Sequence, residues 1–302
     1  MTSNIYTHKD SNIRKTWFFV TLFFVLLILI GWVFSQIYGN PTILYLFVIF
    51  SILLNIFSYW FSDRIVLKLH RAKPATREEH FDLWNATENL SITAGLPMPR
   101  LYVTDDSSPN AFATGRNKEH SAVAVTTGLL QILDKTELEG VIAHELSHIG
   151  NRDMLLSTIV VVMVGFVTLL SDFFLRSAMW GGGRGSNRGG QVQGVMFLVG
   201  IILAILSPFI AILIQLAISR KREFLADSSG ALLTRYPEGL ANALRKISSH
   251  GTPMRTANDA TAHLFISNPF GGGKTRLLHK IFMTHPPTEE RIKALTGHTE
   301  TS

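Results

Sequence analysis

The stretch HELSH, residues 144–148, has residue types and a spacing that suit metal-assisted hydrolysis. On a helix, His144 and His148 lie one turn apart on the same face, where two imidazoles can share one metal ion. Glu145 follows the first histidine and can reach a water molecule bound to that ion. A catalytic site of this kind needs a third protein ligand and an open position for water. The third ligand must therefore come from elsewhere in the chain.

The residues before HELSH predict the helix that this geometry requires. Thr136 and Glu139 have the spacing of a capping box, which predicts Thr136 as the N-cap and Glu137 in the first turn. Gly150 and Asn151 predict the end of the helix.

The third ligand is predicted in the stretch EFLAD, where Glu223 and Asp227 lie four residues apart on another helix. An apolar hairpin separates EFLAD from HELSH and returns the chain to the membrane face that it left. We therefore predict Glu223 as the third metal ligand. Asp227 is predicted to accept a hydrogen bond from the far nitrogen of a ligand histidine. The alternative is a solvated acidic pair beside the basic residues KR.

The residue types favour zinc, one ion per chain. The chain has no cysteine, so His, Asp or Glu must hold any metal. Two neutral imidazoles and one carboxylate leave zinc with a net positive charge, which lowers the pKa of a bound water toward about 7. Glu145 is predicted to take the proton of that water as it attacks a carbonyl, which the metal polarises.

Four apolar blocks place this site beside a membrane. They contain one ionisable residue, Asp172, and they are Trp17–Ile37, Pro41–Phe61, Met154–Phe174 and Val195–Ile218. About 20 apolar residues cross a bilayer, so all four blocks are predicted to be transmembrane helices. Buried helices of a soluble core are the alternative, but these would be shorter and interrupted by polar residues. The first block is too long for a cleaved signal peptide and is predicted to remain as an anchor.

The basic residues, which give a net charge of +6, gather at the edges of these blocks. They precede the first block and follow the second and fourth: Lys9, Arg14, Lys15, Arg64, Lys68, Arg71, Lys73, Arg220, Lys221 and Arg222. By the positive-inside rule, both termini and residues 62–153 are predicted to be cytoplasmic, although Arg176, Arg184 and Arg188 count against this orientation. The same placement argues against nucleic acid as a partner, because the charges follow the membrane edges.

The predicted organisation has four parts. They are residues 1–61 with the N-terminal tail and the first two transmembrane helices, residues 62–153, a transmembrane hairpin over 154–218 with an external Gly-rich loop, and residues 219–302. The second and fourth parts are predicted to be halves of one cytoplasmic domain, because both lie on the same side of the membrane.

Two stretches of the first half, RLYVTD and HSAVAVTTG, have the β-branched content of strands, and NAFATG lies between them. HSAVAVTTG is expected as an ordinary core strand. The alternative is an edge strand along which an extended peptide can pair, with Asn110 and Ala113 lining the groove.

Taken together, HELSHIGNRD, EFLAD after an apolar hairpin, NAFATG and THPPTEERI resemble the HtpX membrane zinc metalloproteases of bacteria and, more distantly, the CaaX prenyl-protease group. The resemblance covers nearly the whole chain. It implies an α-helical integral membrane protein with four transmembrane helices and a cytoplasmic α+β zincin-like metalloprotease domain. The implied activity is a stress-linked zinc endopeptidase of the bacterial cytoplasmic (inner) membrane, with misfolded membrane proteins as substrates. By motif, His144, His148 and Glu223 match the metal ligands of that family, and Glu145 matches its general base. Asp227 matches the residue that accepts a hydrogen bond from a ligand histidine.

Further assignments follow from the resemblance with less support from the residues themselves. His285, in THPPTEER, resembles a histidine near the substrate carbonyl that would help to hold the oxyanion, and Arg291 would brace the site. The alternative is that PPTEER only begins the last helix, with Glu289 and Glu290 favouring the helix dipole.

The stretch NPFGGGKTR, residues 268–276, invites comparison with a phosphate loop but lacks the first glycine of that motif, so no nucleotide is expected. It is interpreted as a loop, with a lid over the cleft as one possible role.

Two other classes of function compete with a peptidase. A zinc-stabilised membrane scaffold would not need Glu145, and structural zinc sites usually close all four positions with protein ligands. A small transporter would need polar groups at mid-depth in the membrane, where these blocks carry almost no charge. The sequence therefore favours a membrane zinc endopeptidase.

Overall fold

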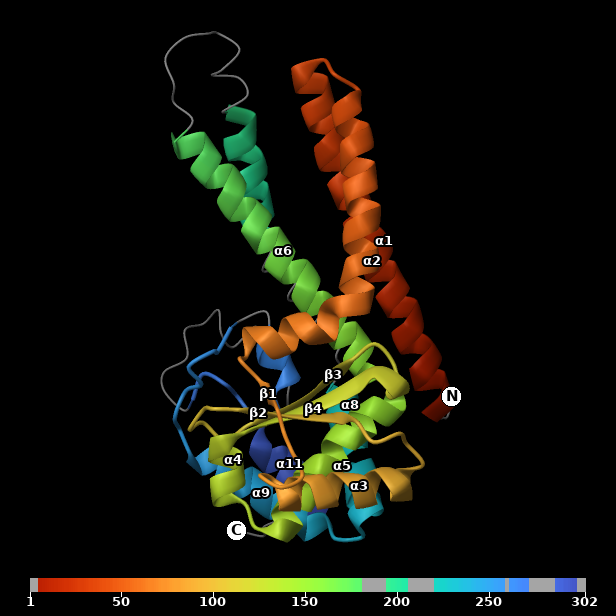
Figure 1. The fold of residues 1–302 in the computed structure, drawn as a ribbon, viewed down its shortest axis with the longest axis vertical. Helices are drawn as coiled ribbons and strands as arrows, with labels where there is room; N and C mark the ends of the chain where they lie inside the picture. Colours follow the sequence, from red (N-terminus) through yellow and green to blue (C-terminus); the bar gives the residue numbers. More distant parts are fainter. Residues whose placement is uncertain (1–4, 181–193, 206–219, 259–260, 272–285, 298–302) are drawn as a thin grey trace.

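The computed structural model describes residues 5–180, 194–205, 220–258, 261–271 and 286–297 (Figure 1). Its labelled elements are α1 (Ile5–Tyr38), α2 (Thr42–Leu69), β1 (Lys73–Pro74), α3 (Phe81–Ala94), β2 (Arg100–Thr104), β3 (Ala111–Gly115), η1 (Lys118–His120), β4 (Ser121–Thr126), α4 (Thr127–Ile132), α5 (Lys135–Asn151), α6 (Asp153–Trp180), α8 (Arg220–Thr234), α9 (Pro237–Ser249), η2 (Ala262–Leu264) and α11 (Thr288–Thr296).

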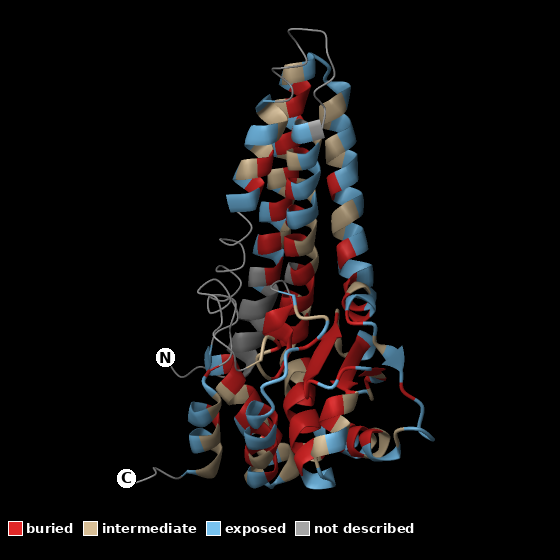
Figure 2. Ribbon diagram, turned by 90° about the vertical axis from the view of Figure 1, so that its left-hand side faces the viewer, coloured by how far each residue is buried: buried red, intermediate tan, exposed pale blue. Residues whose placement is uncertain are grey.

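Within the described residues, three helices are long and apolar enough to cross a membrane: Thr16–Tyr38 of α1, Thr42–Leu69, and Asp153–Ser177 of α6. The fourth predicted block begins with the shorter apolar helix Gly194–Ile205, and its remaining residues lie outside the described part of the chain. The count of four spans therefore stays a prediction. Figure 1 shows these helices rising on one side of a compact part that holds the sheet and the shorter helices. Buried residues concentrate in that compact part, whereas the rising helices carry many exposed ones (Figure 2).

The helix α2 continues past Phe61, the predicted end of the second span, to Leu69. Its last turns pack against the sheet through Val66 and Leu67, which are buried, whereas Arg64 and Lys68 are exposed. The predicted boundary at residue 62 therefore falls inside a helix. This helix carries the chain directly from the apolar bundle onto the sheet.

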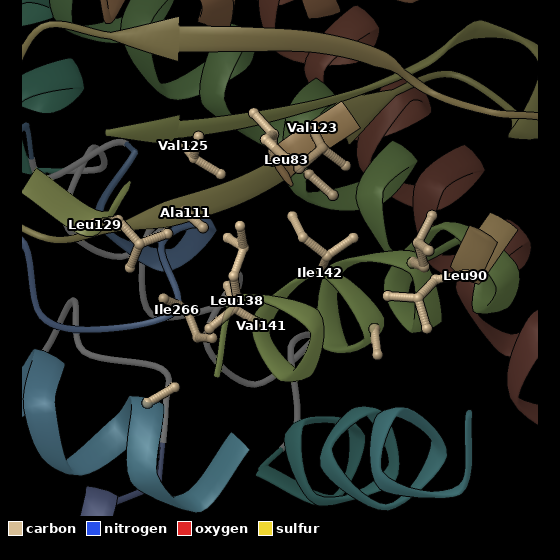
Figure 3. Close-up of a cluster of buried hydrophobic side chains, with 14 of the residues drawn as sticks. Leu83, Leu90, Ala111, Val123, Val125, Leu129, Leu138, Val141, Ile142 and Ile266 are labelled. Atoms are coloured by element: carbon tan, nitrogen blue, oxygen red, sulfur yellow. The ribbon is translucent and has the colours of Figure 1, made fainter. Parts of the chain in front are cut away.

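The sheet has the strand order β1-β2-β4-β3, with β2 parallel to β4 and the two outer pairs antiparallel. Alternate residues of β4 face opposite sides, as the two-residue period of a strand requires. Val123 and Val125 belong to the core shared with α5, and Ala122 and Ala124 pack with the end of α2. Figure 3 shows Val123 and Val125 above the side chains of α5. The sheet is thus covered on both faces.

The interpretation of HSAVAVTTG as a core strand is confirmed, and the alternative of an edge strand is wrong. β4 lies between β2 and β3 and is buried along its whole length, which suits its unbroken run of small and β-branched residues. The edge strand on this side is β3, from NAFATG, and Ala113 lies on it. Asn110 instead fixes a neighbouring segment, since its amide donates to the carbonyl of Ser267 (3.1 Å) and accepts from the Ser267 N–H (3.2 Å).

The helix predicted around HELSH is present as α5, but its predicted N-cap is wrong. Asp134 is the N-cap: its carboxylate accepts from the Glu137 N–H (3.0 Å), and the Glu137 carboxylate accepts from the Asp134 N–H (2.9 Å). Thr136 instead donates its hydroxyl to Asp134 (2.7 Å). Both pairs have capping-box spacing, and the negative charge of Asp134 also suits the helix N-terminus.

Two glycines let α5 approach its neighbours closely. A Cβ atom on Gly140 would lie 2.6 Å from the backbone nitrogen of Leu240 in α9, and one on Gly230 of α8 would lie 3.0 Å from the backbone nitrogen of His144. The helix that carries HELSH is therefore held between α8 and α9 at backbone contact distance.

We expect Gly140→Ala to lower the free energy of unfolding by about 1–3 kcal/mol, because the new methyl group overpacks the α5–α9 contact. Gly150→Ala is the matched control on the same helix, since its Cβ would meet only the Leu96 side chain at 3.9 Å. That change should be neutral or stabilising by up to about 1 kcal/mol. Denaturant unfolding of the detergent-solubilised protein measures both, and equal effects would contradict the close-packing argument.

Candidate metal centre

Two histidines of α5 and one glutamate of α8 converge beneath the start of α6. The Nε2 atoms of His144 and His148 are 3.1 Å apart. The Glu223 carboxylate lies 3.8 Å from His144 Nε2 and 3.7 Å from His148 Nε2. Among the described residues, this is the group of three His, Cys, Asp or Glu side chains placed to hold one metal ion. The fold thus brings Glu223 beside His144 and His148, as the apolar hairpin predicted.

The spacing of these three donor groups fits zinc. Zinc–nitrogen and zinc–oxygen bonds of about 2.0–2.2 Å in tetrahedral geometry place the donor atoms roughly 3.3 Å apart. The observed separations of 3.1, 3.7 and 3.8 Å bracket that value. The donor set is also chemically suitable, because imidazole and carboxylate are both common zinc ligands.

A carboxylate backs each histidine at its other ring nitrogen. Asp227 lies 2.9 Å from His144 Nδ1, and Asp153 lies 3.2 Å from His148 Nδ1. An ionised carboxylate can only accept hydrogen bonds, so each ring carries a proton on Nδ1. In the neutral rings, the lone pairs of both Nε2 atoms then face one another and Glu223. A divalent cation between them satisfies all three donors at once.

The electrostatics of the cluster favour positive charge near His148. Burial alone would lower the pKa of His148, but the carboxylates of Glu223 and Asp153 raise it to about 9. A cation at Nε2 can supply that positive charge in place of a proton. Burial lowers the pKa of His144 to about 4, which keeps that ring neutral near pH 7 and suits it to be a ligand.

Glu145 is buried next to the cluster. Its carboxylate accepts a hydrogen bond from the backbone N–H of Ala113 on β3, and burial raises its pKa to about 7. A carboxylate with a pKa near the working pH can both take up and release a proton efficiently. The edge strand therefore positions the residue best suited to proton transfer.

A small cleft of about 30 Å³ opens beside these groups. Its walls come from β3, α5, α6, α8 and η2, and it is lined by Ala113, Glu145, His148, Asp153, Met154, Ser157, Arg222, Glu223, His263 and Leu264. A cavity of this size holds about one or two water molecules, which suits a site that must admit the water for hydrolysis. The cleft lies where α6 leaves the compact part.

Comparison with known families shows the family of the chain that carries this cluster. Residues 78–299 match Peptidase family M48, a range that covers strands β2, β3 and β4, the cluster and α11. The chain belongs to peptidase family M48. M48 peptidases are zinc metalloproteases, and the cluster of His144, His148 and Glu223 could bind that metal.

Curated relatives of this M48 peptidase carry the name "Protease HtpX homolog". One from Thermoanaerobacter pseudethanolicus is 47% identical over 298 residues and covers 98% of both chains. Another from Tropheryma whipplei is 49% identical over 237 residues, which covers 78% of this chain and 79% of the relative. The predicted membership of the HtpX family of metalloproteases is thus confirmed, and the apolar helices are consistent with a membrane protein.

A solved structure, that of S. mikatae Ste24p, resembles this M48 peptidase with a TM-score of 0.51 at 18% identity. The match covers 93% of this chain and 66% of the longer Ste24p chain. At this identity the likeness concerns the fold alone, which the two proteins share.

The remaining predicted residues of the M48 peptidase divide into two cases. Arg291 lies in α11, is buried and donates to both oxygens of Asp227 at 2.7 and 2.8 Å, and to the Ile266 carbonyl at 2.9 Å. Burial alone would raise the pKa of Asp227, but Arg291 holds it well below its usual range. His285 and most of the 268–276 loop lie outside the described residues, so their roles stay predictions.

Three residues of the centre were missed by the sequence analysis: Asp153, Arg222 and His263. Arg222 was counted among the membrane-edge charges, but it is buried and donates to Asp153 at 2.9 Å. In the sequence, the only signal for Asp153 was its position just after the predicted end of the helix. In the structure, α5 ends there because Arg152 adopts a left-handed conformation (φ 58°). His263 lines the cleft, and its Nε2 lies 3.3 Å from the Ser157 carbonyl. No sequence spacing predicted that contact.

Proposed function

We propose that this protein is a zinc-dependent endopeptidase of the bacterial cytoplasmic membrane that cuts misfolded or damaged membrane proteins on the cytoplasmic side. The observation that carries the proposal is the convergence of two carboxylate-backed histidines and Glu223 beside the buried Glu145. In this assignment His144, His148 and Glu223 hold one zinc ion, and Asp227 and Arg291 brace His144.

Zinc, when bound, lowers the pKa of a water molecule and polarises the carbonyl to be cut. Glu145 takes the proton of the attacking water and passes it to the leaving amine, which its raised pKa favours. An extended substrate segment is proposed to pair along the edge strand β3, rather than along HSAVAVTTG; β3 is buried, and its Ala111 carbonyl accepts from the Ile266 N–H (3.0 Å). His285 is proposed to help hold the oxyanion.

The cytoplasmic orientation is supported by the charges at the base of α2. Arg64 and Lys68 are exposed in the last turns of this helix, after the apolar block that ends at Phe61. Basic residues at this position favour the cytoplasmic side. We propose that residues 62–153 and 219–302 form one domain there, interrupted by the hairpin 154–218.

A location next to the membrane suits a peptidase whose substrates are membrane proteins. The cleft includes Met154 and Ser157 in the first turns of α6, the helix that continues into the apolar bundle. A flexible segment that emerges from lipid therefore reaches the cleft without crossing the compact part, while water and metal remain on the aqueous side.

Metal removal tests the proposal. We expect a chelator to abolish cleavage of a loosely folded membrane protein in detergent, and one equivalent of zinc per chain to restore it. The same flexible segment without its membrane anchor should be cut more slowly, because it is not delivered to the cleft. Cleavage by protein that has been shown to hold no metal would overturn the assignment, and self-cleavage is followed in the same samples.

A further inference from the structure

We propose that Asp153 and Arg222 form a positioning pair that holds the His148 proton on Nδ1 and thereby keeps His148 ready to bind the metal. The inference rests on the proposed role of His148 as a ligand. It assigns a function to two charged residues that neither the ligand set nor the proton-transfer step uses.

The geometry divides the two oxygens of one carboxylate between two donors. Asp153 Oδ2 lies 3.2 Å from His148 Nδ1, and Asp153 Oδ1 accepts from Arg222 Nη1 at 2.9 Å. Both Asp153 and Arg222 are 5% exposed. A buried carboxylate held by a fixed guanidinium has little freedom to turn, so it presents the same oxygen to the imidazole.

The pair also connects the two ends of a long segment. Asp153 is the first residue of α6, and Arg222 lies in the first turn of α8, next to Glu223. The residues between them include the apolar helices on the membrane side. A shift of the start of α6 relative to the start of α8 would therefore move the partner of His148 relative to the ligand Glu223. The metal centre is in this way sensitive to the arrangement of the membrane hairpin.

The substitution Asp153→Asn separates this role from simple packing. Arginine can only donate hydrogen bonds, so the asparagine oxygen will turn toward Arg222 and its amide nitrogen toward His148. That nitrogen donates to Nδ1 and moves the ring proton to Nε2, the atom required by the metal. Removing the arginine in Asp153→Asn/Arg222→Met lets the amide turn over and present its oxygen to His148 again.

The experiment is a zinc titration of the full-length protein in detergent, in competition with a chromophoric chelator. We expect Asp153→Asn to weaken zinc binding by about 10–100-fold, as is typical for loss of a group behind a ligand histidine. The double variant should recover most of that loss. Asp63→Asn is the matched control, because Asp63 is a buried partner of Arg100 at the base of α2 but touches no residue of the cluster.

Unfolding of the metal-free variants shows whether each one folds. Wild-type zinc affinity in Asp153→Asn would overturn the inference, as would a double variant that binds zinc more weakly than the single one. Should Asp153→Asn fold poorly, the double variant decides alone, since a folded double variant unable to bind zinc contradicts the proposed mechanism. A wild type that binds zinc but cuts nothing would refute the proposed activity and leave this result standing.

Discussion

Glu145→Gln is expected to abolish proteolysis while leaving zinc binding intact. General-base catalysis contributes about 10²–10⁴-fold to the rate, so kcat should fall by a factor of that size. Glutamine has nearly the same shape and keeps an oxygen that can accept from the Ala113 N–H, which holds the carboxylate in the native protein. The change therefore removes the ability to accept a proton without removing the contact to β3.

The measurement is single-turnover cleavage of a loosely folded membrane protein, with the zinc content of each sample determined in parallel. Glu139→Gln is the matched control, because it makes the same substitution on the same helix at a half-exposed position away from the cluster. Full activity of Glu145→Gln at equal zinc occupancy would remove the general-base assignment. Zinc binding without cleavage by the wild type would instead favour the scaffold interpretation.

The proximity of the three donor residues was predictable because it depends on two simple geometric rules. Residues four apart on a helix share a face, which places His144 beside His148. An apolar hairpin must return to the membrane face that it left, which brings Glu223 back to them. Neither rule requires knowledge of side-chain packing.

The errors arose where several residues competed for one structural role. Asp134 and Thr136 both begin a capping-box pattern, and the choice between them depends on which side chain reaches the helix N-terminus. HSAVAVTTG and NAFATG both pair as strands, and their order depends on contacts with α2 and α5 that are remote in sequence. Local patterns predicted these elements but not their places.

The interpretation of Arg222 as a membrane-edge charge was wrong for a different physical reason. Arg222 next to an apolar block looks like a residue at the membrane edge, whereas in the fold it is a buried partner of Asp153. A count along the chain does not distinguish a solvated charge from one compensated across the structure. By contrast, the spacing of residues at the end of α2 does indicate one buried helix face. That face consists of Asp63, Val66, Leu67 and His70, which are all buried.

Arg291→Met is expected to produce the largest loss of stability among these variants, about 3–5 kcal/mol in the metal-free protein. Arg291 is 1% exposed, and its guanidinium makes two hydrogen bonds to Asp227 and one to the Ile266 carbonyl. Methionine fills much of the same volume but leaves the Asp227 charge buried without the cation that stabilises it. Breaking one side of a buried pair carries a cost of this size because desolvation of the remaining charge is no longer compensated.

The double variant Asp227→Asn/Arg291→Met separates the cost of an uncompensated charge from the loss of packing. It should recover much of the stability, because no net charge then remains buried, although the hydrogen bond behind His144 changes and zinc binding should stay weak. Arg77→Met is the control for an exposed ion pair, since Arg77 faces Glu88 at 3.8 Å on the surface, and it should cost less than about 1 kcal/mol. Denaturant unfolding in the presence of a chelator measures all three. A loss for Arg291→Met no larger than that for Arg77→Met would mean that α11 does not hold the Asp227 carboxylate behind His144, and the bracing role would have to be abandoned.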